Sequence, residues 1–425
     1  MPARNPVPNN FALGIDNRNR ETSLTTSESG AMSLRDAVNV DIDQRGQVRR
    51  RKGRRLIQAY TTPHSLWSCP QIDYGLFAAN GSLFLLQDGT ATDLGVSVGL
   101  GPVAYAELDG VVYWSDGVST GTVADGIVGR WGLSVPATPT VQSYANGGLP
   151  LAEYGVTLTV VADNGEESGA PQSAIVVAQY GIQITGLASL PSGWSYRLYV
   201  THPDGLDPHE YADIPAGVSS FIISSPPSGD IVRTQFAEPP PVARHLCAYH
   251  GRVYMASGNV LWHTSDESPR LYRPMLDFRL FPENITMLQA REDGIFVGTD
   301  KRTYFLSGND ATQQRQILAH PKGAIEGAQA LLPPEFFGGA GVGEIGFAPA
   351  WRDAIGVLCI GRSGGQVQQI ARDRVAAGGH RQGAMAWREF DGLMQVLSTL
   401  WAPTSEQVSL GDRWNATVHT QGITP

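Results

Sequence analysis

The sequence predicts an all-β protein, and its composition is the first reason. The 425 residues include 49 Gly and 28 Pro, which interrupt helices and favour short strands joined by turns. Hydrophobic residues make up 42% of the chain, as in a folded protein, and the length allows two or three domains or one large domain with an insertion. Two further reasons are a recurring hairpin pattern and a run of alternating apolar residues in the middle of the chain.

Residues 1–60 are predicted to form an N-terminal arm and a basic hairpin. Up to about Ser33 the chain is polar and has no periodicity, which predicts an extended arm that orders only against a partner. A short turn or helix, a strand, the turn QRG and a second strand should follow. The hairpin carries a basic cluster, which consists of Arg45, Arg49, Arg50, Arg51, Lys52, Arg54 and Arg55.

A repeated pattern starts at about Leu66 and predicts a series of hairpins. Each copy is an apolar run, a tight turn ending in Gly and a second run with an aromatic residue. The turn pairs contain residues that tolerate the positive φ of two-residue hairpin turns. They are Asn80-Gly81, Asp109-Gly110, His250-Gly251 and Asp293-Gly294. Weaker fifth and sixth copies of the repeat are expected at 345–371 and 386–414.

Such meanders bury both faces when they are stacked radially around an axis. Residues 61–134 and 239–425 are therefore predicted to form one discontinuous β-propeller of about five or six blades. A sandwich or an open series of meanders is the alternative. The helix-forming segment 326–343 does not fit the repeat, and a gate or lumen loop is one role for it.

Residues 135–238 are predicted to be a domain inserted into the propeller. Proline marks both edges, in VPATPT and AEPPPVARHL. Residues 134–238 hold ten acidic and two basic side chains, whereas residues 1–60 hold eleven basic and six acidic ones. About seven alternating strands are expected, the size of a small β-sandwich. The insert resembles fibronectin type III domains in Tyr154, the Glu167-Ser168 turn and the strand from Ser195 to Thr201.

No enzymatic site, metal site or cofactor is expected. Gly117 to Gly121 matches the nucleophile-elbow string, but Ser119 lacks the strand-turn-helix context. Asp41 to Gly46 begins like a calcium loop but departs from it at Arg45 and Lys52. His245 and His250 are five residues apart across a turn, and this spacing does not indicate a metal site. Cys69, Cys247 and Cys359 lie far apart, which argues against a disulfide framework or a zinc site and favours buried thiols.

A pair of facing carboxylates for glycoside hydrolysis is not excluded by the sequence. The candidates, however, stand where turns favour Asp; they are Asp109, Asp116, Asp293 and Asp300. The chain has no apolar stretch typical of a signal peptide or a membrane span. It is expected to be made in a cytoplasm.

The basic cluster has two interpretations. A nucleic-acid site would carry interleaved aromatic residues, and only Tyr60 is nearby. An interface arm would instead pair its arginines with carboxylates of a neighbouring subunit, for which the acidic insert is one source. The second interpretation is preferred.

Ser33 to Leu56, SLRDAVNVDIDQRGQVRRRKGRRL, resembles the N-terminal signature of structural proteins in tailed bacteriophages. The hairpin repeats with a fibronectin-like insertion are similar to the tail nozzle (tail tubular B type) proteins of short-tailed phages. The resemblance implies a ring, commonly of six copies, that contacts a tail adaptor and a tail fibre or needle in the virion. It also implies a channel through which DNA leaves without specific binding, for which an acidic or mixed lining is expected.

A second class of function stays open. A carbohydrate-binding or carbohydrate-degrading propeller would act as a host-recognition module, and nine Trp, among them Trp114, Trp262 and Trp387, leave room for it. Packing between blades is the alternative role for these side chains. An intracellular scaffold propeller is the third option.

Overall fold

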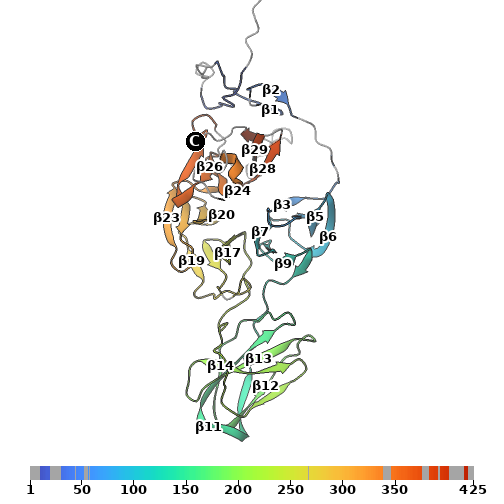
Figure 1. Cartoon of the computed structure of the whole chain (residues 1–425), viewed down its shortest axis with the longest axis vertical. Helices are drawn as coiled ribbons and strands as arrows, with labels where there is room; N and C mark the ends of the chain where they lie inside the picture. Colours follow the sequence, from blue (N-terminus) through green and yellow to red (C-terminus); the bar gives the residue numbers. More distant parts are fainter. Residues whose placement is uncertain are drawn as a thin grey trace, which may run out of the picture. The chain divides into compact units, whose positions relative to one another are not determined.

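The computed structural model describes most of the chain, which divides into two compact units. The first spans Thr62–Leu280, and the second combines Met1–Thr61 with Phe281–Pro425 (Figure 1). The described residues are 10–19, 30–43, 45–51, 56, 58–266, 268–337, 346–375, 382–390, 393–401 and 416–419. Within them, helical structure is limited to two short 3₁₀ turns, η2 (Pro334–Phe337) and η3 (Ser363–Gly365). The all-β prediction is confirmed, and no described helix is long and apolar enough to cross a membrane.

The unit Thr62–Leu280 contains three four-stranded antiparallel sheets whose strands follow one another in sequence order. This is the topology of a propeller blade. The first sheet is β3 (His64–Trp67), β4 (Gly75–Ala79), β5 (Ser82–Gln87) and β6 (Thr90–Ser97). The second is β7 (Ala104–Leu108), β8 (Val111–Ser115), β9 (Thr120–Ala124) and β10 (Ile127–Gly129), and the third is β16 (His245–Tyr249), β17 (Arg252–Ser257), β18 (Val260–His263) and β19 (Phe278–Leu280).

These three sheets pack face to face through apolar side chains. Leu76 and Leu83 of the first sheet share a core with Trp114 of the second. Tyr113 of the second sheet shares another with Met255 of the third. Each sheet thereby buries the apolar side chains that a single meander would expose to water. The fold is propeller-like.

The unit formed by residues 1–61 and 281–425 contains a hairpin and two larger sheets. The hairpin is β1 (Val40–Ile42) with β2 (Val48–Arg50), and a four-stranded sheet is β20 (Ile285–Arg291), β21 (Gly294–Thr299), β22 (Thr303–Ser307) and β23 (Arg315–His320). A seven-stranded sheet follows, made of β24 (Ala324–Leu332), β25 (Ala348–Asp353), β26 (Leu358–Gly361), β27 (Val367–Ile370), β28 (Gln382–Phe390), β29 (Leu393–Trp401) and β30 (Ala416–His419). Phe296 lies 4.8 Å from Phe305 and 5.4 Å from Trp351 between ring centroids, so these two sheets share an aromatic core.

Two expectations for the C-terminal half are corrected. The segment 326–343 is mainly a strand where it is described, because β24 runs to Leu332 and pairs with β25. Only the short 3₁₀ turn η2 follows it, and residues 338–343 lie outside the described part. The sixth repeat does not form a separate sheet among the described residues. Instead β28 joins β24 through the parallel pair Glu326 and Gln382, so the fifth and sixth copies share the seven-stranded sheet.

Three of the four predicted turn pairs adopt the backbone conformation that their residues favour. Asn80 and Gly81 have φ of 54° and 77°, and the same left-handed conformation occurs at Asp109-Gly110 and His250-Gly251. The fourth prediction is wrong. Arg291 pairs with Gly294, which places the turn at Glu292 and Asp293 and makes Gly294 the first residue of β21.

Gly294 is required by close packing and not by its φ. A Cβ there would lie 2.3 Å from the Leu306 carbonyl oxygen and 2.4 Å from the Phe305 ring. We therefore expect Gly294→Ala to reduce the unfolding free energy by about 3 kcal/mol, because this buried site cannot expand freely. Gly81→Ala, with open space around it, should cost about 1 kcal/mol through its left-handed φ alone. Amide exchange in β20–β22 and in β4–β5 measures each effect, and equal losses of protection would contradict this explanation.

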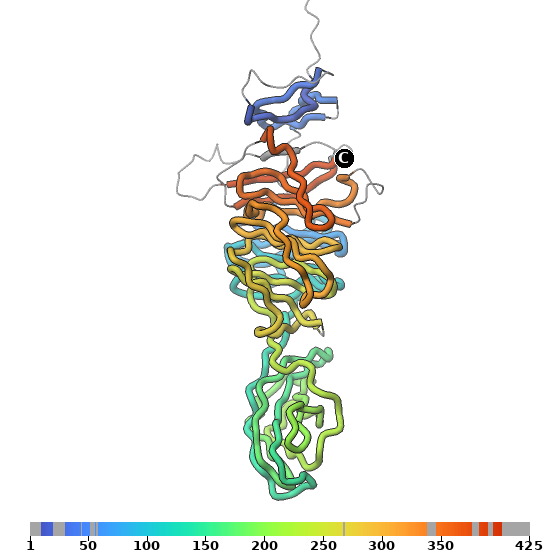
Figure 2. Tube along the Cα trace, turned by 90° about the vertical axis from the view of Figure 1, so that its left-hand side faces the viewer, coloured from blue at the N-terminus to red at the C-terminus, as the bar shows by residue number. Residues whose placement is uncertain are grey.

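The insert contains five strands where about seven were expected. They are β11 (Thr140–Val161), β12 (Ala174–Thr185), β13 (Ser195–Thr201), β14 (Pro208–Pro215) and β15 (Ser220–Ile223), in the sheet order β14-β13-β11-β12-β15. The difference arises because β11 continues for 22 residues through two register shifts that bend it. The strands, green in Figure 2, enclose a core of their own around Tyr154, Leu158, Ile182 and Leu198.

Candidate functional site

The basic hairpin is held together by its own acidic residues. Val40 pairs with Arg50 and Asp41 with Arg49 across the two strands. The Asp43 carboxylate accepts the amide hydrogens of Arg45 and Gln47 at 2.9 Å, which closes the turn. The amide of Gln47, above all, keeps the pKa of this carboxyl below its usual value. The Asp43 side chain thus stabilises the hairpin turn, while Asp41 belongs to strand β1.

The cluster of basic residues divides into two groups. Arg45, Arg49 and Arg50 are exposed, and Arg49 keeps a 3.0 Å ion pair with Asp43 while its side chain stays 66% exposed. Arg51 is half-buried, and its Nε donates to Asp41 at 3.2 Å. Arg51 therefore stabilises the hairpin, whereas the exposed arginines face solvent. Lys52, Arg54 and Arg55 lie outside the described residues.

The segment before the hairpin is bonded to its own chain. Phe11 donates its amide to Gly46 at 2.7 Å, and Asn17 donates to the Arg374 carbonyl at 2.9 Å. The Arg374 side chain donates in return to the Leu13 carbonyl at 3.1 Å. The expectation that all residues before Ser33 order only against a partner is therefore wrong for residues 10–19, since the chain itself supplies their partners.

The candidate catalytic residues are distributed over four turns. Asp116 accepts amide hydrogens from Gly99, Val118 and Ser119 at 2.6–2.9 Å. Burial raises the pKa of Asp116, but these amides outweigh it, so the pKa is lowered overall. Ser119 lies on the same turn between strands β8 and β9. Asp109 belongs to a turn of the same sheet, and Asp293 and Asp300 belong to turns of the sheet β20–β23.

The cysteines and tryptophans differ from one another in exposure. Cys247 and Cys359 are buried thiols as expected, but Cys69 is only half-buried. Trp114 is 2% exposed and belongs to the core between two sheets. Trp387 is 39% exposed, so core packing does not account for all of its surface.

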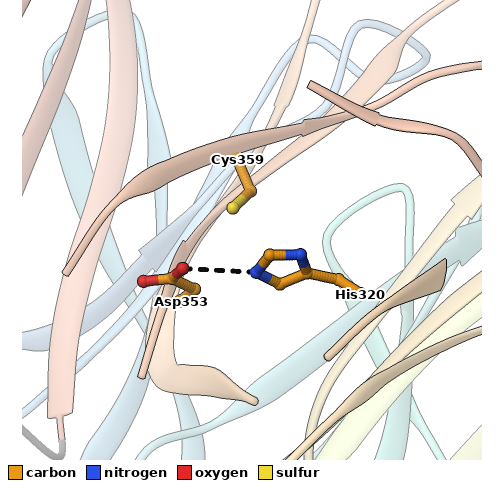
Figure 3. A group of neighbouring side chains, drawn as sticks. All are labelled: His320, Asp353 and Cys359. Carbon is orange, nitrogen blue, oxygen red and sulfur yellow. Dashed lines mark hydrogen bonds and ion pairs between the residues drawn. The ribbon is translucent and has the colours of Figure 1, made fainter. Parts of the chain in front are cut away.

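A buried group that the sequence did not indicate lies between the two larger sheets of the second unit. His320 ends β23, Asp353 ends β25 and Cys359 lies in β26. Their ligand atoms all lie within 4.8 Å of one another, and His320 Nε2 is 3.3 Å from Asp353 Oδ2 (Figure 3). His320 is 7% exposed, and the other two side chains are fully buried.

The neighbours of this group fix its geometry. Asp353 Oδ1 accepts the amide hydrogens of Ile355 at 3.1 Å and Val357 at 2.8 Å, which leaves Oδ2 directed at the histidine. Burial first, and the Asp353 charge second, raise the pKa of the Cys359 thiol. Arg352 is also buried, and burial lowers its pKa to about 10; its described hydrogen bonds go to Ser398 and to the Gly356 carbonyl.

The chain matches no family model and no curated protein. Among solved structures it is similar to BBS1N, solved in complex with ARL6DN and soaked with mercury. That similarity has 10% identity and a TM-score of 0.29, over 81% of this chain and 90% of the other. The AfRom2 CNH domain has 9% identity and a TM-score of 0.27 over 80% and 91% of the two chains. The N-terminal domain of Nup159 has 10% identity and a TM-score of 0.27, over 79% of this chain and 73% of the other.

Proposed function

We propose that this chain is a structural subunit of a bacteriophage tail, which assembles into a nozzle ring around the channel for DNA. The sequence signature of Ser33 to Leu56 is the origin of this proposal. The observation that carries it is the hairpin inside that signature, whose turn is closed by Asp43 while Arg45, Arg49 and Arg50 remain exposed. A rigid hairpin with exposed arginines is suited to binding carboxylates of another subunit, because guanidinium groups pair well with them.

The insert offers carboxylates of the required kind. Seven of its acidic side chains are exposed, namely Glu153, Asp163, Asp204, Asp207, Asp213, Asp230 and Glu238. Opposite charges on the arm and the insert support contacts between identical subunits, and they also disfavour contacts that place like charges together. The ring then meets a tail adaptor on one side and a fibre or needle protein on the other, in the virion. DNA passes through without specific contacts.

The finer assignment of the insert as fibronectin III-like also belongs to this proposal. Tyr154 is fully buried, and its hydroxyl donates to the Pro150 carbonyl at 2.9 Å. A tyrosine that bonds back to the backbone a few residues upstream is characteristic of immunoglobulin-like sandwiches. Such a domain would present its acidic surface to a neighbouring subunit or to a fibre protein.

A glycan-binding module is the second candidate, supported by two exposed tryptophans on adjacent strands. Trp387 in β28 is 39% exposed, and Trp401 in β29 is 41% exposed. Exposed aromatic surface often marks a binding site. Electron microscopy of the purified chain together with a glycan array separates the two candidates. Ring-shaped particles without glycan binding support the nozzle, whereas monomers that bind glycans support the second candidate.

A further inference from the structure

The strongest feature outside the proposed interface is the buried group of His320, Asp353 and Cys359. These are three different metal-ligating side chains, directed at one point from the ends or middles of three strands (Figure 3). His320 comes from the sheet β20–β23, while Asp353 and Cys359 come from the following sheet. A bound ion would therefore join two sheets that otherwise meet through the apolar contacts around Phe296 and Trp351.

We propose that His320 Nε2, Asp353 Oδ2 and Cys359 Sγ bind a divalent transition-metal ion, with Zn²⁺ as the preferred ion. An imidazole, a carboxylate and a thiolate are ligands that zinc accepts together. With bonds of about 2.0–2.2 Å, nitrogen and oxygen ligands of a tetrahedral zinc lie roughly 3.3–3.5 Å apart. The 3.3 Å between His320 Nε2 and Asp353 Oδ2 agrees with such an edge. With a zinc–sulfur bond of about 2.3 Å, the edges to Sγ would be roughly 3.5–3.7 Å. Cys359 Sγ lies within 4.8 Å of both other atoms and would move inward by up to about 1 Å as the ion binds.

The charges also fit a divalent cation. In the bound state Cys359 loses its proton to solvent as the S–Zn bond forms, and neutral His320 donates its Nε2 lone pair while Nδ1 keeps its proton. One carboxylate and one thiolate then balance the two charges of the ion, and the nearby buried Arg352 guanidinium adds one further positive charge that interacts with both anions. A water molecule completes the four ligands.

The surroundings position the ligands as second-shell contacts do at metal sites. Two backbone amides hold the Asp353 carboxylate through Oδ1, which fixes the direction of Oδ2. The Gln369 side chain is hydrogen-bonded to Cys359, a contact of the kind that orients a metal ligand. The site does not depend on the oligomeric function proposed above, since all three ligands belong to one unit of one chain.

Cobalt binding to the purified full-length chain tests the proposal. Co²⁺ in place of zinc should bind at one ion per chain and give a thiolate-to-cobalt charge-transfer band in the near ultraviolet. Cys359→Ser should abolish the band, and His320→Gln should weaken Co²⁺ binding at least about tenfold. Cys247→Ser is the matched control, because Cys247 is equally a buried thiol but is not part of the group. A band that survives in Cys359→Ser, or no band in the wild-type chain, overturns the proposal.

Thermal unfolding provides a readout that does not need a variant. Removing metal from the wild-type chain with a chelator should lower the unfolding midpoint of the unit that contains residues 281–425 by at least about 5 °C, and added Zn²⁺ should restore it. Cys247→Ser should show the same fall. A midpoint that does not respond to chelator or to zinc counts against the site, even where the variants fold poorly.

Discussion

Replacing Arg49 and Arg50 together by glutamate is expected to convert the proposed ring into single chains. Both side chains are exposed on β2, and among the described residues no ion pair of Arg50 occurs. The double change turns two cations that face solvent into two anions, so an acidic partner surface is repelled where it was attracted. Sedimentation in low and moderate salt measures the loss, and wild-type rings should themselves loosen as salt rises.

The folded chain should tolerate this double substitution. Arg49 loses a surface ion pair with Asp43, a kind of contact worth about 0–1 kcal/mol. The matched control is Lys301→Glu with Lys322→Glu, which changes net charge equally at exposed sites outside the hairpin. That control should still form rings. If both double variants assemble normally, the hairpin is not the interface.

Tyr154→Ala is expected to unfold the insert while the neighbouring sheets of the same unit stay folded. Tyr154 is 0% exposed and belongs to the core that the strands β11–β15 enclose. Removing its ring leaves a cavity and should cost about 3–5 kcal/mol, a large share of the stability of a domain this size. Hydrogen exchange should show protection lost across β11–β15 and kept across β7–β10.

Tyr154→Phe separates packing from hydrogen bonding at the same site. It keeps the ring and removes only the donation to the Pro150 carbonyl, which should cost about 1 kcal/mol. Protection that falls equally in the insert and in β7–β10 after Tyr154→Ala would show that the insert does not fold as a separate cooperative unit.

The sequence predicts local features well because they depend on neighbouring residues. The Asn80-Gly81 turn follows from residues that adopt positive φ easily, and the sheets on either side follow from alternating apolar runs. In the sequence Gly294 resembles the glycines of the other turn pairs. In the structure, however, a glycine is required there because the Phe305 ring of the next strand leaves no room for a Cβ. Strand β11 runs through two bulges because tertiary pairing with β12 and β13 continues beyond them.

The sequence identified the arginines of the candidate interface, but it did not show which of them are exposed and which one is half-buried against the hairpin. Arg51 differs from Arg50 because successive side chains point to opposite faces, and Arg51 lies on the face of Asp41, whose carboxylate also forms a 3.7 Å ion pair with Arg388. His320 and Asp353 are 33 residues apart, and only the packing of one sheet on the next brings them together. No motif spacing indicates such a group, since the sequence does not specify which strand ends meet.

The mass of the purified chain in solution, measured by sedimentation over a range of protein and salt concentrations, tests the central claim most directly. A structural ring subunit predicts a closed particle, with six times the mass of one chain as the expected value. A chain that remains a monomer under every condition would contradict the proposal that its function is to assemble with copies of itself.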